Sequence, residues 1–148
     1  MIAYADSSVL VSLFHADTLS PKVWRWFERA DLVCHYTALH RLEVRNPLRR
    51  LRRASGPWGE AAWGALRASE GVNGRLRAAT VNLAATLAEA DLLSERHAPT
   101  LKLAFGAMDA WHVAAAVALG PELFLTGDKG QAALAERAGL KVKLFSAG

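Results

Sequence analysis

The sequence has little that would tie it to a membrane or to an oxidising compartment. Its single cysteine, Cys34, cannot form an internal disulfide, and the apolar residues around it predict a small buried side chain. No apolar run reaches the length of a membrane span. The short apolar start has no basic segment before it and is interrupted at Asp6, so we expect no signal peptide. These absences favour a cytoplasmic protein with no membrane association.

Several nucleotide-binding and metal-binding motifs are also missing. The chain contains no Cys/His set with zinc spacing, no GxxxxGKS/T phosphate loop and no GxGxxG dinucleotide motif. It has no internal repeat, low-complexity segment or linker, and its 148 residues fit one domain, which we expect to cover residues 1–148. The net charge of +4 is compatible with a polyanionic partner, although charge informs on solubility and steering rather than on activity.

Short β-prone runs alternate with longer helical segments along the chain. This order predicts an α/β fold in three α/β/α layers, with a mainly parallel central sheet flanked by helices. We expect strands at 2–5, 32–36, 122–126 and 141–145, and an ambiguous stretch at 76–83 has room for a short one. Helices are expected after Asp6, with Ser7 or Ser8 as the cap, from Ser20-Pro21, and over 38–53, 57–70, 84–97, 109–119 and 130–138.

Four acidic residues fall where this topology brings them to one edge of the sheet. Asp6 and Asp128 each directly follow a predicted strand, so both lie at the carboxyl edge. Glu43 is in the early turns of the helix after the second strand, and that helix begins at the same edge. Asp109 starts the helix that leads into the strand at 122–126, so its own start lies back at the carboxyl edge. Ligands of open α/β sheets bind at this edge.

A cluster of carboxylates at close range favours a bound cation, because like charges raise one another's pKa. Hard oxygen ligands suit Mg²⁺ or Mn²⁺, and such ions polarise a phosphodiester and activate water. Each acid also has a structural alternative: a helix cap or turn for Asp6, a helix N-terminus for Asp109, a solvated helix face for Glu43 and an ordinary turn for Asp128.

Four motifs in order make the chain resemble a known family. Asp6 in IAYADSSVLV, Glu43 in TALHRLEVRN, Asp109 in MDAWHVAAA and Asp128 in FLTGDKG look like a PIN domain, and more narrowly like the VapC toxins of type II toxin–antitoxin pairs. The resemblance runs nearly end to end, and 55–75 is its least diagnostic part. It implies a PIN-like fold and a Mg²⁺- or Mn²⁺-dependent endoribonuclease that cleaves RNA. It also implies a homodimer and a cognate antitoxin protein.

The resemblance also assigns roles to individual residues. Asp6, Glu43, Asp109 and Asp128 would be the catalytic metal ligands. Ser7 and Thr126 match family hydroxyls that would support the acids by hydrogen bonds, Asn46 matches the asparagine of an E-x-x-N pattern, and His112 matches a D-x-x-H position that packs or supports the ligands. Some members carry a further acid or aromatic just after the last motif, where this chain has Lys129, Gly130 and Gln131. Whether the site holds one ion or two is therefore open.

The helix predicted over 38–53 becomes strongly basic in its second half. Its arginines could contact RNA, or they could simply form a solvated face; the candidates for RNA contact are Arg45, Arg49, Arg50, Arg52 and Arg53. Two other functions fit the same motifs: an RNA-binding or protein-interaction module without catalysis, and a PIN nuclease outside a toxin–antitoxin pair. A phosphatase that forms an aspartyl-phosphate would prefer an acid two residues after Asp6, where Ser8 stands.

Overall fold

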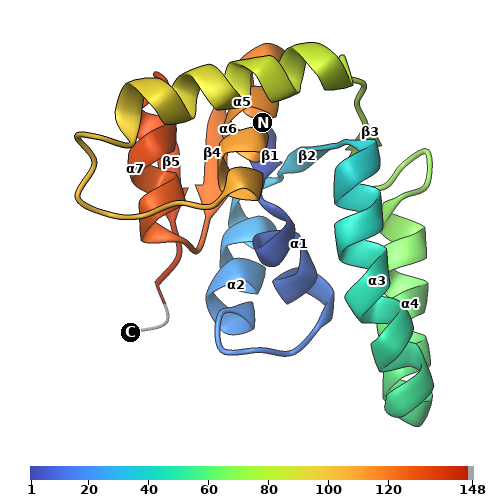
Figure 1. Ribbon diagram of the computed structural model, residues 1–148. Helices are drawn as coiled ribbons and strands as arrows, with labels where there is room; N and C mark the ends of the chain where they lie inside the picture. The colour runs from blue at the N-terminus through green and yellow to red at the C-terminus, as the bar shows by residue number, and fades with distance from the viewer. Residues whose placement is uncertain (147–148) are drawn as a thin grey trace.

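A five-stranded, all-parallel sheet forms the middle of the structure, a computed structural model that describes residues 1–146 (Figure 1). The strands are β1 (Ile2–Ala5), β2 (Val33–Tyr36), β3 (Leu76–Ala78), β4 (Leu123–Thr126) and β5 (Val142–Leu144). Their order across the sheet is β3-β2-β1-β4-β5, so β1 lies at the centre and pairs with both β2 and β4. The ambiguous stretch at 76–83 therefore does supply an edge strand.

Helices cover both faces of this sheet. One layer contains α1 (Ser7–Phe14), α2 (Ser20–Ala30), α3 (Ala38–Ala54) and α4 (Gly56–Ser69). The other contains α5 (Leu83–His97), α6 (Ala107–Leu119) and α7 (Lys129–Arg137). The predicted three-layer α/β/α fold is confirmed, and the sheet is wholly parallel. Within residues 1–146, no helix combines the length and apolarity needed to cross a membrane.

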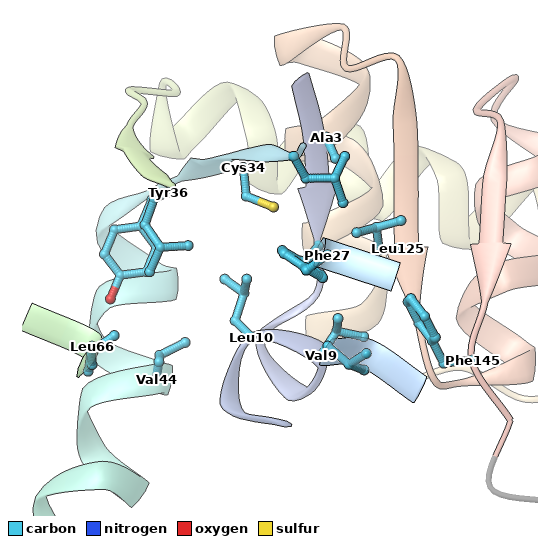
Figure 2. Packing of buried hydrophobic residues seen from close by; sticks show 14 of the residues in the cluster. Ala3, Val9, Leu10, Phe27, Cys34, Tyr36, Val44, Leu66, Leu125 and Phe145 are labelled. Carbon is cyan, nitrogen blue, oxygen red and sulfur yellow. The ribbon is translucent and has the colours of Figure 1, made fainter. Parts of the chain in front are cut away.

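Successive side chains of the buried strands point to opposite faces of the sheet, which gives the protein two hydrophobic cores. On β1, Ala3 and Ala5 face the α1–α4 layer, whereas Tyr4 faces the α5–α7 layer. On β4, Leu125 faces the α1–α4 layer and Phe124 faces the α5–α7 layer. Figure 2 shows the first core, in which residues of α1, α2, α3 and α4 meet the sheet. Because β1 is buried on both faces, the residue that follows it is held firmly at the sheet edge.

The α3–α4 hairpin extends away from the sheet (Figure 1). The two helices approach closely at Gly59, where a Cβ atom would lie 2.3 Å from the Leu51 carbonyl oxygen. Only glycine allows this approach without moving a backbone. Most predicted helix bounds agree with the observed ones to within two residues, but Asp6 itself, and not Ser7 or Ser8, caps α1.

Candidate functional site

Asp6 lies at the carboxyl end of the central strand, with its side chain 5% exposed. Its Oδ1 accepts hydrogen bonds from the Ser8 hydroxyl (2.8 Å) and the Val9 N–H (2.9 Å), and the Val9 bond caps α1. Its Oδ2 accepts a hydrogen bond from the Thr126 hydroxyl at 2.7 Å. Burial raises the pKa of Asp6 despite these three donors, because a desolvated carboxylate is costly.

Thr126 joins Asp6 to the start of α7. Its Oγ1 lies 2.7 Å from Asp6 Oδ2 and 2.6 Å from Gln131 Oε1, and it also accepts the Asp128 N–H at 3.0 Å. One hydroxyl proton cannot serve both oxygen acceptors. The Thr126 hydroxyl therefore donates to either Asp6 Oδ2 or Gln131 Oε1 at one time.

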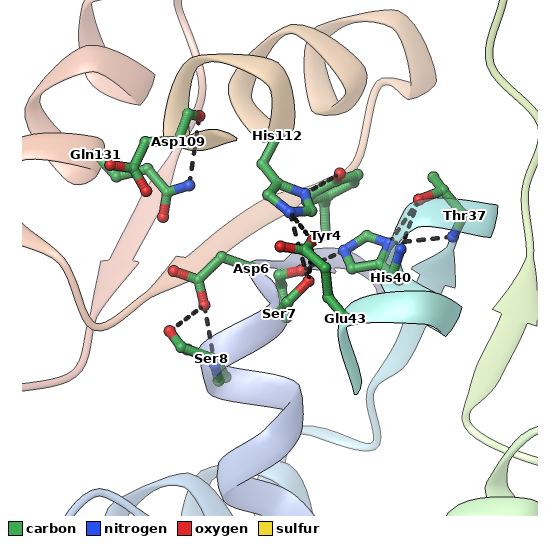
Figure 3. Close-up of polar contacts among 12 residues, drawn as sticks. Tyr4, Asp6, Ser7, Ser8, Thr37, His40, Glu43, Asp109, His112 and Gln131 are labelled. Atoms are coloured by element: carbon green, nitrogen blue, oxygen red, sulfur yellow. Dashed lines mark hydrogen bonds and ion pairs between the residues drawn. The ribbon is translucent and has the colours of Figure 1, made fainter. Parts of the chain in front are cut away.

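Glu43 is brought to the same edge from α3. Its Oε1 accepts hydrogen bonds from the Ser7 hydroxyl and from His112 Nε2, each at 2.7 Å (Figure 3). Burial acts to raise the pKa of Glu43, but the hydrogen bonds from His112 and Ser7 outweigh it, so the pKa lies below its ordinary value. Glu43 is therefore held ionised next to Ser7, the residue that follows Asp6.

The partners of His112 fix which of its nitrogens carries the proton. A carboxylate can only accept, so Nε2 must donate to Glu43. Nδ1 then accepts a hydrogen bond from the Tyr4 hydroxyl, 2.7 Å away. Burial, followed by the charges of Glu43 and Asp6, raises the pKa of Tyr4, which keeps this phenol a donor. A buried chain of hydrogen bonds thus runs from Tyr4 through His112 to Glu43.

A second buried histidine, His40, ties α3 to the end of β1. The Thr37 N–H donates to His40 Nδ1 at 3.0 Å, so Nε2 carries the proton and donates to the Ala5 carbonyl at 2.8 Å. Burial, with the nearby His112 next in weight, lowers the pKa of His40 to about 3, so the imidazole is neutral. This contact holds the residue just before Asp6.

Asp109 and Asp128 both bind backbone N–H groups at the starts of helices. Asp109 Oδ2 accepts the Gly106 N–H at 2.7 Å in the first turn of α6. Asp128 Oδ1 accepts the Gln131 N–H at 2.7 Å and caps α7. Gln131 also connects the two helix starts, since its Nε2 donates to the Asp109 carbonyl at 3.4 Å. Asp6 caps a helix and Asp109 lies at a helix N-terminus, which are the local roles considered from the sequence, whereas Asp128 caps α7 and does not form an ordinary turn.

The four acids are carried by one sheet edge but do not form a compact cluster. Within residues 1–146, no three His, Cys, Asp or Glu side chains stand in a group able to hold a metal ion. The donor chemistry does fit a hard divalent cation, because Glu43, Asp109 and Asp128 each use a single carboxylate oxygen in the hydrogen bonds of the described residues. Asp6 has one contact on Oδ2, which leaves that oxygen a second lone pair.

Other sequence candidates lie outside this network. Asn46 is exposed on α3, and its side chain makes no hydrogen bond within residues 1–146. Arg45 forms a two-contact ion pair with Glu70, at 3.0 and 3.2 Å, and the two side chains are 14% and 8% exposed. Arg52 pairs with Glu60, and Arg49, Arg52 and Arg67 lie over the Trp63 ring. Arg50 and Arg53 remain exposed on α3.

Sequence reasoning missed four residues of the site: Tyr4, Ser8, His40 and Gln131. Signals existed for two of them. His40 stands three residues after the cap Thr37, which is where a side chain returns to the cap, and Gln131 stands three residues after the cap Asp128, which accepts its backbone N–H. Tyr4 lies inside a buried strand, and its partner His112 comes from another layer, so no local pattern marks it.

Comparisons with known proteins bear on family and fold. The family model described as PIN domain matches residues 3–137 of the chain. A search of curated proteins gave no match. Among solved structures, the chain is similar to the crystal structure of FitAcB from Neisseria gonorrhoeae, with a TM-score of 0.64, 19% sequence identity and 96% of each chain covered. At this identity the likeness supports the fold.

Proposed function

The chain belongs to the PIN domain family, and from this premise we propose that it is a Mg²⁺- or Mn²⁺-dependent endoribonuclease, the toxin of a type II toxin–antitoxin pair. PIN domains are generally nucleases that use divalent metal ions, so membership of the family supports hydrolysis of phosphodiester bonds as the general activity. The RNA substrate, the metal requirement and the toxin role are the finer parts of the proposal.

The observation that carries the proposal is the buried Asp6 carboxyl at the carboxyl edge of β1. Its pKa is raised by burial, although Ser8, Val9 and Thr126 all donate to it. A nearby divalent cation would offset that desolvation and keep Asp6 ionised. The acid is thus held in a rigid position at which a positive partner would favour its ionised form.

Asp6, Glu43, Asp109 and Asp128 would hold the ion. When bound, it supplies an activated water and polarises the scissile phosphate. Thr126 and Ser8 fix the orientation of the Asp6 carboxylate, and Ser7 and His112 fix that of Glu43. Supporting contacts of this kind orient metal ligands and tune their basicity.

Two substitutions test the catalytic part. Asp6→Asn and Asp109→Asn should abolish Mg²⁺-dependent cleavage of RNA, measured on single-stranded RNA with EDTA as the metal-free control. Asp6→Asn should also raise the thermal midpoint of the metal-free protein at neutral pH, because it removes a buried ionisable carboxyl whose ionisation opposes folding. Mn²⁺ should raise the midpoint of the wild-type protein only. Undiminished cleavage by both purified variants would rule the proposal out.

A second candidate is a PIN-fold RNA-binding or protein-interaction module without catalysis. It is favoured by the capping roles of Asp6, Asp109 and Asp128, and by the lack of a ready three-ligand group within residues 1–146. Isothermal calorimetry with Mn²⁺ separates the two, since the module need not bind metal. If the wild-type protein gives a heat of Mn²⁺ binding that Asp6→Asn lacks, the enzyme is supported. If the wild-type protein gives no such heat, the module without catalysis is supported.

The partners proposed are a cognate antitoxin and a second copy of the chain, acting in the cytoplasm. The exposed Trp24 on α2 (41% exposed) offers an apolar contact for a homodimer. A PIN nuclease outside a toxin–antitoxin pair would share the same catalytic edge. Growth arrest on induction, relieved by the product of a neighbouring small gene, would identify the toxin; sedimentation of wild-type and Trp24→Ala proteins would test the dimer.

A further inference from the structure

A basic groove lies between α2 and β5. Its cavity volume is about 310 Å³, and no acidic side chain lines it; the lining residues are Lys22, Arg25, Trp26, Arg29, Lys143, Leu144, Phe145 and Ser146. The cations come from segments more than a hundred residues apart in the sequence, so their convergence is a product of the fold. No local charge run in the sequence points to this surface.

The periodicity of α2 separates its charges. Lys22, Arg25 and Arg29 recur at three- and four-residue steps and share one face of the helix, whereas Glu28 lines a different pocket. Lys143 pairs in register with Leu125, whose side chain joins the core on the α2 side of the sheet. Strand and helix therefore present their cations to the same groove.

Two aromatic residues form the floor. Phe145 is 3% exposed, and the Trp26 ring packs edge-on against it with centroids 6.1 Å apart. The Lys143 ammonium lies 5.6 Å from the Phe145 centroid. The floor is thus fixed by core packing, and the charged groups stand on a rigid base.

Three of the groove cations differ from Arg45 and Arg52 of α3 in their partners. Arg25 donates only to the Pro21 carbonyl, at 3.2 Å, and Lys22 donates to the Ser146 carbonyl. Across residues 1–146, Arg25, Arg29 and Lys143 have no carboxylate within ion-pair distance. By contrast, Arg45 and Arg52 each have a glutamate partner. Arg25, Arg29 and Lys143 therefore leave positive charge in the groove for a ligand.

The groove is joined to the acidic edge through Thr126. The Phe145 N–H donates to the Thr126 carbonyl at 2.8 Å, and the Thr126 side chain holds Asp6. Leu19, just before α2, lies against Gly127, where a Cβ atom would stand 2.9 Å from its Cδ1. The Phe145 end of the groove is therefore connected to the acidic edge through Thr126.

We propose that this groove binds the backbone phosphates of single-stranded RNA next to the acidic edge, an assignment that rests on the proposed ribonuclease function. Guanidinium groups form paired hydrogen bonds to phosphates, and a positively charged groove that follows the backbone is typical of proteins that bind single strands. A polyanion is attracted along the groove while Asp6 and Glu43 repel it at the edge, so the phosphates next to the scissile one need these cations.

The test measures RNA binding apart from cleavage. A fluorescein-labelled, mixed-sequence single-stranded RNA is titrated in EDTA by fluorescence anisotropy at several salt concentrations. Arg25→Gln/Arg29→Gln should weaken binding and lower the magnitude of the log K versus log salt slope by about 1.4, at roughly 0.7 per lost phosphate contact. Arg96→Gln/Lys102→Gln makes the same charge change at exposed sites on the α5–α6 side and should leave the slope unchanged. Circular dichroism confirms that both variants fold.

The outcomes distinguish the groove from the ribonuclease proposal. If the wild-type protein cleaves RNA, Arg25→Gln/Arg29→Gln should raise KM and keep kcat at saturating RNA. If it cleaves nothing, the catalytic proposal fails while the binding titration still tests the groove. Equal slopes for the groove and α5–α6 variants would overturn the inference. So would a larger loss in Arg50→Gln/Arg53→Gln, or a groove that binds poly-glutamate peptide but not RNA.

Discussion

His112 Nε2 lies 2.7 Å from Glu43 Oε1, although the two residues are 69 positions apart in the sequence. The contact crosses the sheet edge from α6 to α3, and the Tyr4 hydroxyl fixes the imidazole from the other side. The contact thereby fixes the relative positions of α3 and α6, which lie on opposite faces of the sheet, at the acidic edge. Glu43 is held ionised by this contact and by Ser7.

Loss of the His112 donor should weaken the site without dismantling the fold. We expect His112→Ala to reduce metal affinity and cleavage by about 10–100-fold, the usual effect of removing a group that orients a ligand. His112→Gln, whose amide can donate from a similar position, should recover part of the loss. Calorimetry with Mn²⁺ and RNA cleavage assays measure both. Equal losses for the two variants would show that packing, and not donation to Glu43, is the role of His112.

Much of this arrangement could be predicted from local sequence patterns. The alternation of strands and helices specifies the parallel sheet, and strand ends followed by Asp6 and Asp128 locate the carboxyl edge. The hydroxyls expected next to the acids, Ser7 and Thr126, do donate to carboxylates in the structure, to Glu43 and Asp6 respectively. These are short-range consequences of a side chain's position relative to a strand end.

The contacts that no pattern indicated join residues of different layers. Tyr4 meets His112 across the α6 face of the sheet, and the basic groove joins α2 to β5. Arg45 and Arg52 show the converse. They belong to a charge run that suggests a binding surface, but in the fold Glu70 and Glu60 pair with them. Pairing of this kind depends on which elements become neighbours, so it is fixed only by the tertiary fold.

His40 should make stability depend on pH in the acidic range. Its pKa is about 3 in the folded protein and 6.5 ordinarily, so the unfolded chain takes up a proton first as the pH falls. Stability is therefore fully present above pH 6.5 and is lost as the pH falls toward about 3, by at most about 1.4 kcal/mol per pH unit. Urea unfolding measured at several pH values between these limits should show that the free energy of unfolding changes more steeply with pH for the wild-type protein than for His40→Gln.

The same substitution should also lower stability at neutral pH. Gln cannot both accept from Thr37 and donate to Ala5 in the imidazole geometry, and one unsatisfied buried group costs about 1–3 kcal/mol. His97→Gln, at the partly exposed end of α5, is the matched control. Parallel pH profiles for wild type and His40→Gln would contradict the assignment of a buried neutral imidazole.

Arg45 should behave as a structural residue and not as an RNA ligand. Arg45→Met removes one partner of a mostly buried ion pair, but Glu70 keeps Arg67 at 3.2 Å, so the cost should stay below about 3–5 kcal/mol, the cost of an unpartnered buried charge. Arg52→Met breaks an exposed pair and should cost no more than about 1 kcal/mol. Urea unfolding measures both, and Arg45→Met/Glu70→Gln should recover part of the loss. If Arg45→Met is fully stable but binds RNA weakly, the structural role is wrong.

Gly130 should tolerate almost no substitution. It lies just after the last motif, where some PIN domains carry a further acid. A Cβ atom at this position would lie 1.9 Å from the Ala104 carbonyl oxygen, so any side chain must displace either the loop before α6 or the start of α7. We expect Gly130→Ala to cost about 1–3 kcal/mol and to disturb Asp128 and Gln131 beside it. Gly64→Ala is the matched control, because nothing lies within 4 Å of its added Cβ in α4 and alanine favours a helix by about 1 kcal/mol. Thermal unfolding should therefore shift in opposite directions for the two variants, and a stable Gly130→Asp variant would show that this backbone can accommodate an additional acid.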